Sequence, residues 1–157
     1  MSYIIGNQAK AYWSATALTD VTESHVTTWL SSATLAGNLM DLTLEIDSEF
    51  VDATTRAEAA QGFASEIAVL KGGRITFEAR WQPGDAMFDA LIAAWNDPTN
   101  NDFAMVALDQ LSSVTGTQGI AANWSVSLNR TEPLRDIMKS NVTLAIASYP
   151  SWYKKTS

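Results

Sequence analysis

The middle of the chain contains a stretch in which apolar and polar side chains alternate without interruption. Its apolar members are Leu42, Leu44 and Ile46, and its polar members are Asp41, Thr43, Glu45 and Asp47. A period of two is typical of a strand with one buried face, because successive side chains leave opposite faces of a sheet. The pattern predicts a strand over 41–47, with the apolar side chains toward the core and the polar ones together on the other face.

A second strand-like segment, 50–56, and a small, polar stretch, 57–65, follow. After them, the strand-like segments 67–71 and 74–81 flank Gly72-Gly73. A glycine pair between two such segments is a strong hairpin signal, because the primed turns need positive φ at the tip. The sequence therefore predicts a tight hairpin at Gly72-Gly73.

A helix is predicted from Asp85 to about Trp95. Its apolar residues recur at i, i+1, i+4, i+5 and i+8, which places them on one face at a 3.6-residue period. They are Met87, Phe88, Leu91, Ile92 and Trp95. Asp85 can cap the first turn, and Asn96-Asp97-Pro98 ends the helix. We expect all five apolar side chains to pack on the core.

The remaining chain predicts four more strands, two loops and a tail. The strands are 8–18, 103–108, 122–130 and 139–148. Segment 19–38 is a loop or weak strand anchored by Val26, Trp29 and Leu30, and 111–119 is a second loop. The aromatic and basic tail is 150–155. Segment 103–108 is almost wholly apolar, so we expect it to be covered on both faces.

Several short strands around one helix indicate a mainly β fold, an antiparallel β-sandwich or barrel with one flanking α-helix. Strands and helices do not alternate along the chain, which argues against a doubly wound α/β sheet. The 157 residues contain no linker or internal repeat, so a single domain over 1–157 is expected.

Composition narrows the class of protein. The hydrophobic fraction of 46% is normal for a globular domain and argues against wholesale disorder. No apolar run approaches the roughly 18 to 20 residues of a membrane helix, and residues 1–6 lack the features of a signal peptide. There is no cysteine, so no disulfide framework can form. We expect a protein made in a bacterial cytosol that has no membrane partner.

The net charge of −7 argues against a protein that grips nucleic acid, because that affinity comes mainly from Lys and Arg on phosphates. Seven acids lie between 41 and 66, opposed there only by Arg56. A charge run of this kind is usually a solvated surface. The alternative is a surface that repels DNA passing close by.

Residues that could carry chemistry are sparse. His25 is the only histidine and lies in a polar segment, and without cysteines the usual ligands of a transition-metal cluster are missing. The sequence has no nucleophile elbow, phosphate-binding loop or dinucleotide fingerprint. Asp41, Glu45 and Asp47 lie on an open strand face without an acidic loop beside them, which argues against a calcium site. No cofactor and no enzymatic activity are expected.

Short motifs are spread over most of the chain. They are Val51-Asp52-Ala53-Thr54-Thr55-Arg56, then Gly62-Phe63, then the segments around Gly72-Gly73, and Asp85-Ala86-Met87-Phe88-Asp89-Ala90-Leu91. Together they resemble the major tail tube proteins of long-tailed bacteriophages. The resemblance implies a tail-tube-like β fold, self-assembly into stacked, hexameric rings, and a virion location. It implies as partners a tape-measure protein, terminator and initiator proteins at the tube ends, and genomic DNA that passes through without specific binding.

Two sets of residues acquire expected roles from this resemblance. The polar side chains of the strand predicted over 41–47 would line the channel. They are Asp41, Thr43, Glu45 and Asp47. The long polar excursion 49–65 would reach a neighbouring subunit, through Phe50, Asp52, Arg56, Glu58, Gly62 and Phe63. The simpler interpretation of that excursion is a mobile surface loop.

Three hypotheses for function remain open. The first is the tube subunit of a phage tail. The second is the tube of a related secretion or contractile injection system, which passes protein instead of DNA. The third is a monomeric β-sandwich that binds a carbohydrate or protein through exposed aromatic side chains, for which the six tryptophans are the candidates. The mass under native conditions separates the third hypothesis from the other two.

Overall fold

The computed structural model describes residues 9–37, 39–57, 61–62, 64–82, 84–97, 103–132 and 134–157. Its elements, in chain order, are β1 (Lys10–Ser14), α1 (Glu23–Ser32), β2 (Thr34–Leu35), β3 (Leu39–Asp52), β4 (Glu66–Arg80), α3 (Ala86–Asn96), β5 (Ala104–Leu108), β6 (Gln118–Thr131) and β7 (Lys139–Lys154). The strands form one seven-stranded sheet in the order β2-β1-β5-β6-β7-β4-β3, and every neighbouring pair is antiparallel.

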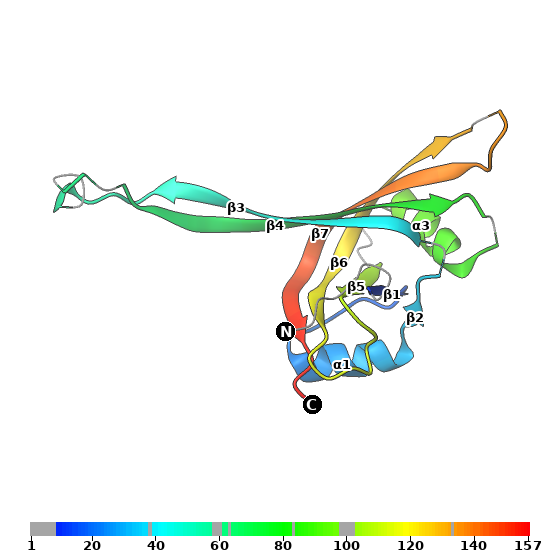
Figure 1. The fold of residues 1–157 in the computed structure, drawn as a ribbon, viewed down its shortest axis with the longest axis horizontal. Helices are drawn as coiled ribbons and strands as arrows, with labels where there is room; N and C mark the ends of the chain where they lie inside the picture. Colours follow the sequence, from blue (N-terminus) through cyan, green and yellow to red (C-terminus); the bar gives the residue numbers. More distant parts are fainter. Residues whose placement is uncertain are drawn as a thin grey trace.

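The sheet is strongly curved, because its two outermost strands are consecutive in the chain. β2 ends at Leu35 and β3 begins at Leu39, so only residues 36–38 join the two edges. A connection this short spans little more than about 13 Å, which brings the edges together. In the view of Figure 1, β3 and β4 run above β1 and β5, across the inside of the curve. The mainly β, antiparallel architecture expected from the sequence is confirmed.

The main core fills the inside of this curve. Alternate residues of five strands point inward, and α3 packs against them through Met87 and Leu91. The fully buried members include Ile75, Phe77, Trp124, Val142 and Leu144, whose positions alternate along β4, β6 and β7 as period-two strands require. Asp85 caps α3, since its carboxylate accepts a hydrogen bond from the Phe88 backbone N–H at 3.2 Å.

A second core lies on the other face of β1, β5 and β6, beneath α1. It joins Val26, Trp29 and Leu30 of the helix to Tyr12 and Val106 of the sheet. β5 is therefore covered on both faces, as its apolar run predicts.

The prediction of a loop or weak strand over 19–38 was wrong, since α1 occupies residues 23–32. The anchors Val26, Trp29 and Leu30 are buried as expected, and their spacing of i, i+3 and i+4 is helical. The surrounding Ser and Thr residues are poor helix formers, which hid this signal. Packing on the sheet outweighs their weak propensity, so the fold has two described helices instead of one.

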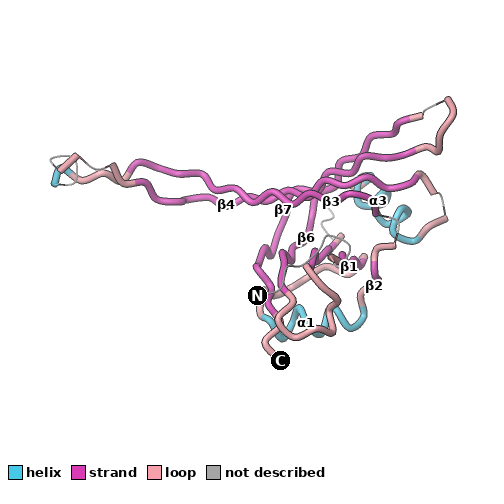
Figure 2. Tube along the Cα trace, in the orientation of Figure 1, coloured by secondary structure: helices cyan, strands magenta, loops and turns pink. Residues whose placement is uncertain are grey.

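The prediction of a tight hairpin at Gly72-Gly73 was also wrong. β4 runs through both glycines without a break, and Gly72 pairs with Asp47 and Gly73 with Ile46. The chain reverses instead between Asp52 and Glu66, which pair with each other. β3 and β4 thus form one long hairpin that projects far from the body (Figure 2).

Three smaller expectations also failed. Trp95 of α3 is 56% exposed, although Met87, Phe88 and Leu91 of the same helix are buried and Ile92 is partly buried. Ile46 is 57% exposed, because β3 has passed the edge of the core at that point. The segment 150–155 is mostly strand, since β7 runs to Lys154. Register shifts near Asn123 accommodate Tyr149, whose φ is +50°, and Pro150.

Candidate assembly surface and channel face

Four strands, β3, β4, β7 and β6, present a continuous polar face opposite the main core. Residues paired across antiparallel strands point to the same side of a sheet. Thr43 pairs with Thr76, Thr76 with Thr143, and Thr143 with Ser127, which makes one row of hydroxyls across all four strands. We call the surface built on this row and its neighbouring rows the polar face.

The adjacent rows add charges of both signs to the polar face. Glu45 pairs with Arg74, which pairs with Ala145, and Arg80 pairs with Lys139. The sequence suggested a purely acidic surface here, because Arg74 and Arg80 lie outside the segment 41–66. Strand pairing brings Arg74 beside Glu45 and places Arg80 beside Lys139 on the same surface, so the polar face is mixed in charge.

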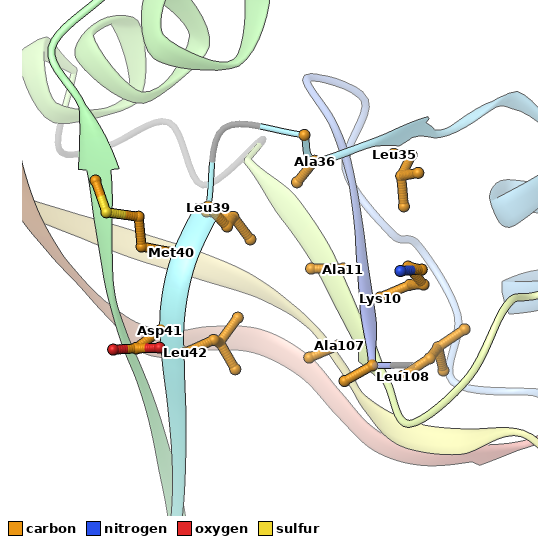
Figure 3. A pocket seen from close by; sticks show the side chains of 12 residues that line it. Lys10, Ala11, Leu35, Ala36, Leu39, Met40, Asp41, Leu42, Ala107 and Leu108 are labelled. Atoms are coloured by element: carbon orange, nitrogen blue, oxygen red, sulfur yellow. The ribbon is translucent and has the colours of Figure 1, made fainter. Parts of the chain in front are cut away.

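The expected channel residues lie together on one side of β3. Asp41, Thr43, Glu45 and Asp47 are all exposed, whereas Leu42 and Leu44 pack against the main core. Figure 3 shows Asp41 and Leu42 pointing to opposite sides of the strand. Sequence reasoning missed Thr76, Thr143 and Ser127, although each alternates with an inward apolar neighbour in its own strand.

The polar face has an open edge at each side. Among the described residues, β3 pairs only with β4, and residues 125–131 of β6 pair only with β7. The order β3-β4-β7-β6 contains four strands that alternate in direction, so the two open edges run in opposite directions. An edge strand with unpaired backbone groups is a template for pairing with another chain. Joining β3 of one copy to β6 of another would give an antiparallel pair.

Beyond this four-stranded sheet, β3 and β4 continue as a two-stranded arm, which we define as residues 46–52 and 66–73. β7 stops pairing with β4 at Arg74, so the arm extends by about 23 Å, at 3.3 Å per strand residue. Phe50 is 60% exposed, and Ile46 and Val51 are also exposed. A two-stranded ribbon with exposed apolar side chains is marginally stable alone and gains from a partner surface.

Side-chain hydrogen bonds tie the end of the arm. The Asp52 carboxylate accepts from the backbone N–H of Thr54 at 2.9 Å and from its hydroxyl, and these bonds lower the pKa of Asp52, the hydroxyl bond most. The Ser65 N–H donates to the Thr54 hydroxyl at 2.9 Å. Of the residues expected to bridge subunits, Phe50 and Asp52 lie on β3, and Arg56 and Gly62 lie at the tip. Glu58 and Phe63 lie outside the described residues.

A groove marks the place where the two edges of the curved sheet meet (Figure 3). It has a volume of about 610 Å³ and is lined by β1, β2, the start of β3 and the end of β5. Leu35, Ala36, Leu39, Leu42 and Ala107 make much of its wall apolar.

The described residues show little that could perform chemistry. They contain no group of three or more His, Asp or Glu side chains that could hold a metal ion. Nε2 of His25 accepts a long hydrogen bond, 3.3 Å, from the Thr19 N–H at the surface. No helix in the described parts of the chain is both long and apolar enough to cross a membrane.

The fold is similar to chains in solved tail and tube assemblies. A chain from the tail of an empty gene transfer agent particle, with C6 symmetry, is 13% identical over 94% of this chain and 97% of its own, with a TM-score of 0.64. A chain of the SPP1 tail tube is 12% identical over 99% of this chain and 81% of its own, with a TM-score of 0.65.

A third similar chain belongs to the sheath-tube complex of an extracellular contractile injection system in the extended state. It is 10% identical over 97% of this chain and 92% of its own, with a TM-score of 0.59. No protein-family model and no curated protein matches the sequence. The structural similarity covers nearly the whole chain at very low identity, so it establishes the architecture. This chain has a tail-tube fold.

Proposed function

We propose that this chain, as a single domain, is the structural subunit of a bacteriophage tail tube and assembles into stacked hexameric rings. The observation that carries the proposal is the four-stranded polar face with its two open, oppositely directed edges. The sixfold number is taken from the C6 symmetry of the similar gene transfer agent tail.

The two open edges explain how identical copies of this chain can join into a closed ring. If β3 of each subunit pairs with β6 of the next, every interface joins the same two different surfaces. When the rotation from one subunit to the next is a whole fraction of a full turn, such interfaces close into a ring. All the strands of that ring remain antiparallel, since each subunit contributes an even number of alternating strands. A closed sheet also removes the aggregation hazard of two exposed edges.

The polar face would then line the channel, because the opposite face of the same strands is the hydrophobic core. A row of hydroxyls flanked by charges of both signs offers passing DNA no continuous cationic surface on which its phosphates could be held. Asp41, Glu45 and Asp47 add carboxylates near the open edge of β3. This arrangement suits a wall past which a polyanion must move quickly.

The arm would bridge one subunit to another. Its exposed apolar side chains, Ile46, Phe50 and Val51, have no core of their own to join. Burying each against a neighbour contributes about 1.5 to 3 kcal/mol at full burial. The function so assigned is structural and non-enzymatic.

The proposal also assigns the subunit a location and further binding partners. The subunit would be made in the cytoplasm of a bacterial host and incorporated into the virion tail. A tape-measure protein would lie inside the tube, and terminator and initiator proteins would bind its ends. Genomic DNA would pass through without specific contacts, and no membrane is involved.

A second candidate is the tube of a contractile injection system, which the similarity to the sheath-tube complex favours. Its tube would carry protein and would bind a sheath on its outer surface. That surface would carry α1, because α1 lies across the body from β3 and β4 (Figure 1). Co-purification of a sheath protein with the native tube would favour this candidate over a non-contractile tail.

The direct test is the mass of the purified protein as concentration rises. Sedimentation velocity should show rings or longer polymers, and negative-stain electron microscopy should show hollow tubes, with a tail-initiation complex added as nucleus if needed. A species that stays monomeric at high concentration, with and without that nucleus, would reject the proposal and would favour the monomeric binding module.

A further inference from the structure

The groove described above lies at one end of the β3 edge. Leu39 and Leu42 of β3 line it, and Leu35 and Gly37 lie just before them in the chain. The arm begins at the other end of the same strand. In a ring built on the β3 edge, the groove therefore opens close to the joint between two subunits.

The hairpin between β6 and β7 ends in an apolar tip at residues 134–138. Leu134 is 97% exposed, and Ile137 is also exposed. At the base of this hairpin, Arg130 forms an ion pair with Glu132, and its guanidinium carbon lies 5.0 Å from the centroid of the Trp81 ring. Figure 2 shows the hairpin extending beyond the body of the sheet, at the upper right. A leucine almost wholly in water, at the tip of a hairpin whose strands pair up to Thr131 and Lys139, suggests a contact surface.

Strand register places this tip and the groove at the same end of the sheet. Leu39 pairs with Ala79, Ala79 with Ser140, and Ser140 with Arg130. Arg130 of β6 is thus in the same row as Leu39 of β3. The tip continues from Arg130 in the direction that leads away from the arm, and Leu39 is the first residue of β3, at the end of that strand away from the arm.

We propose that the tip of the β6–β7 hairpin docks in the groove of the next copy in the ring, with Leu134 and Ile137 against Leu35 and Leu39. The inference rests on the proposed ring and names a contact within it. When the β6 edge of one copy pairs with the β3 edge of another, the tip must pass the first residues of that β3. The apolar tip and the apolar groove are then continuous with the backbone pairing.

One competing occupant is the arm of a copy in an adjacent ring. Rings stacked head to tail bring the arm end of one against the groove end of the next, so Phe50 could also reach the groove. The two contacts differ in topology. A tip-to-groove contact joins neighbours around one ring and closes after six copies, whereas an arm-to-groove contact joins rings along the axis without limit.

Because the sequence contains no cysteine, only cysteines introduced by substitution can form disulfides in a trapping experiment. One variant carries Leu134→Cys with Gly37→Cys, where a Cβ meets nothing within 4 Å, and a second carries Leu134→Cys with Leu35→Cys. Two groove positions are tested because strands in a closed sheet are tilted. The tilt shifts by a few residues the groove position that lies opposite Leu134. A competing variant carries Phe50→Cys with Gly37→Cys. Assembled protein is oxidised with copper phenanthroline and separated on a non-reducing gel.

The docking predicts that at least one Leu134 variant gives a covalent ladder that stops at six chains and collapses to monomer on reduction. A ladder without limit from the Phe50 variant, with no cross-link from either Leu134 variant, would overturn the docking while leaving the ring intact. Failure of all variants and of the unmodified chain to assemble would contradict the ring and the docking with it. Leu134→Ser serves as a separate check: it should leave the monomer's thermal unfolding unchanged and weaken ring formation at least tenfold.

Discussion

The Cα of Gly73 lies where the side chain of Ile146 crosses β4. A Cβ added to Gly73 would be 2.7 Å from Cδ1 of Ile146 and 3.5 Å from Cδ1 of Ile120. The glycine is therefore required by side chains of β6 and β7, and it has no role in a turn. A Cβ at Gly72 would be 2.6 Å from Oδ1 of Asp47, whose exposed side chain can rotate away.

We predict that Gly73→Ala destabilises the fold by about 1 to 3 kcal/mol, because an overpacked site must displace Ile146. Urea unfolding followed by circular dichroism measures the change. Gly37→Ala is the matched control, since a Cβ at Gly37 meets nothing within 4 Å and should change stability by less than about 0.5 kcal/mol. Equal stabilities for the two variants would show that Ile146 does not occupy the space above Gly73.

The two glycines also show where sequence interpretation failed. A glycine pair between strand-like segments satisfies the local chemistry of a turn. The side chains that fill the space above it come from Asp47 on β3 and Ile146 on β7, which are distant in sequence. A local sequence pattern cannot predict a contact with a residue that is brought close only by the tertiary fold.

The period-two segments were the most informative part of the sequence. The alternation from Asp41 to Glu45 gave the faces of β3 correctly, and the apolar run of β5 correctly indicated two covered faces. Ile46 is exposed, contrary to the prediction, because the alternation indicates which side of the strand a residue lies on but not where the core ends. Arg74 was missed as a member of the polar face, since only strand pairing places it opposite Glu45.

Lowering the pH should release the C-terminal end of the chain from α1. The Glu23 carboxylate accepts from the backbone N–H of Thr156 and from its hydroxyl, both at 2.8 Å, and these bonds, the backbone bond most, lower the pKa of Glu23. A lowered pKa means that the bond stabilises the fold above the ordinary pKa of Glu and is lost as pH falls through the folded value.

Hydrogen exchange at the Thr156 amide measures this release. Protection should be constant near neutral pH and fall at acid pH, after correction for the intrinsic exchange rate. Glu23→Gln should show weak protection at every pH. A pH-independent protection in the unmodified chain would contradict the role of the carboxylate.

Removing the connection between the two strands of the arm should separate folding from assembly. In the variant, an Asn-Gly turn replaces residues 53–65 and joins the paired residues Asp52 and Glu66. The main core contains no residue of the replaced segment, so the free energy of unfolding should change by less than about 1 kcal/mol. Sedimentation should show that assembly is lost. Normal tubes from this variant would count against a bridging role for the segment.

Lysines on the polar face should make the tube hold DNA. The variant carries Asp41→Lys, Glu45→Lys and Asp47→Lys, all at exposed positions, so folding and tube formation should persist. Retention of a fluorescent DNA duplex by preformed tubes should rise about tenfold or more at low salt and disappear at high salt. The control places three lysines on the exposed side of α1, at Ser24, Thr28 and Ser31. Equal retention by both variants would show that the three carboxylates do not line the channel.

A helical reconstruction of the assembled protein by cryo-electron microscopy tests the central claim most directly. The account predicts a hollow tube of stacked six-membered rings in which the row Thr43, Thr76, Thr143 and Ser127 faces the channel and β3 pairs with β6 of the next subunit. A tube with this row on its outer surface, or rings joined through elements other than β3 and β6, would contradict it.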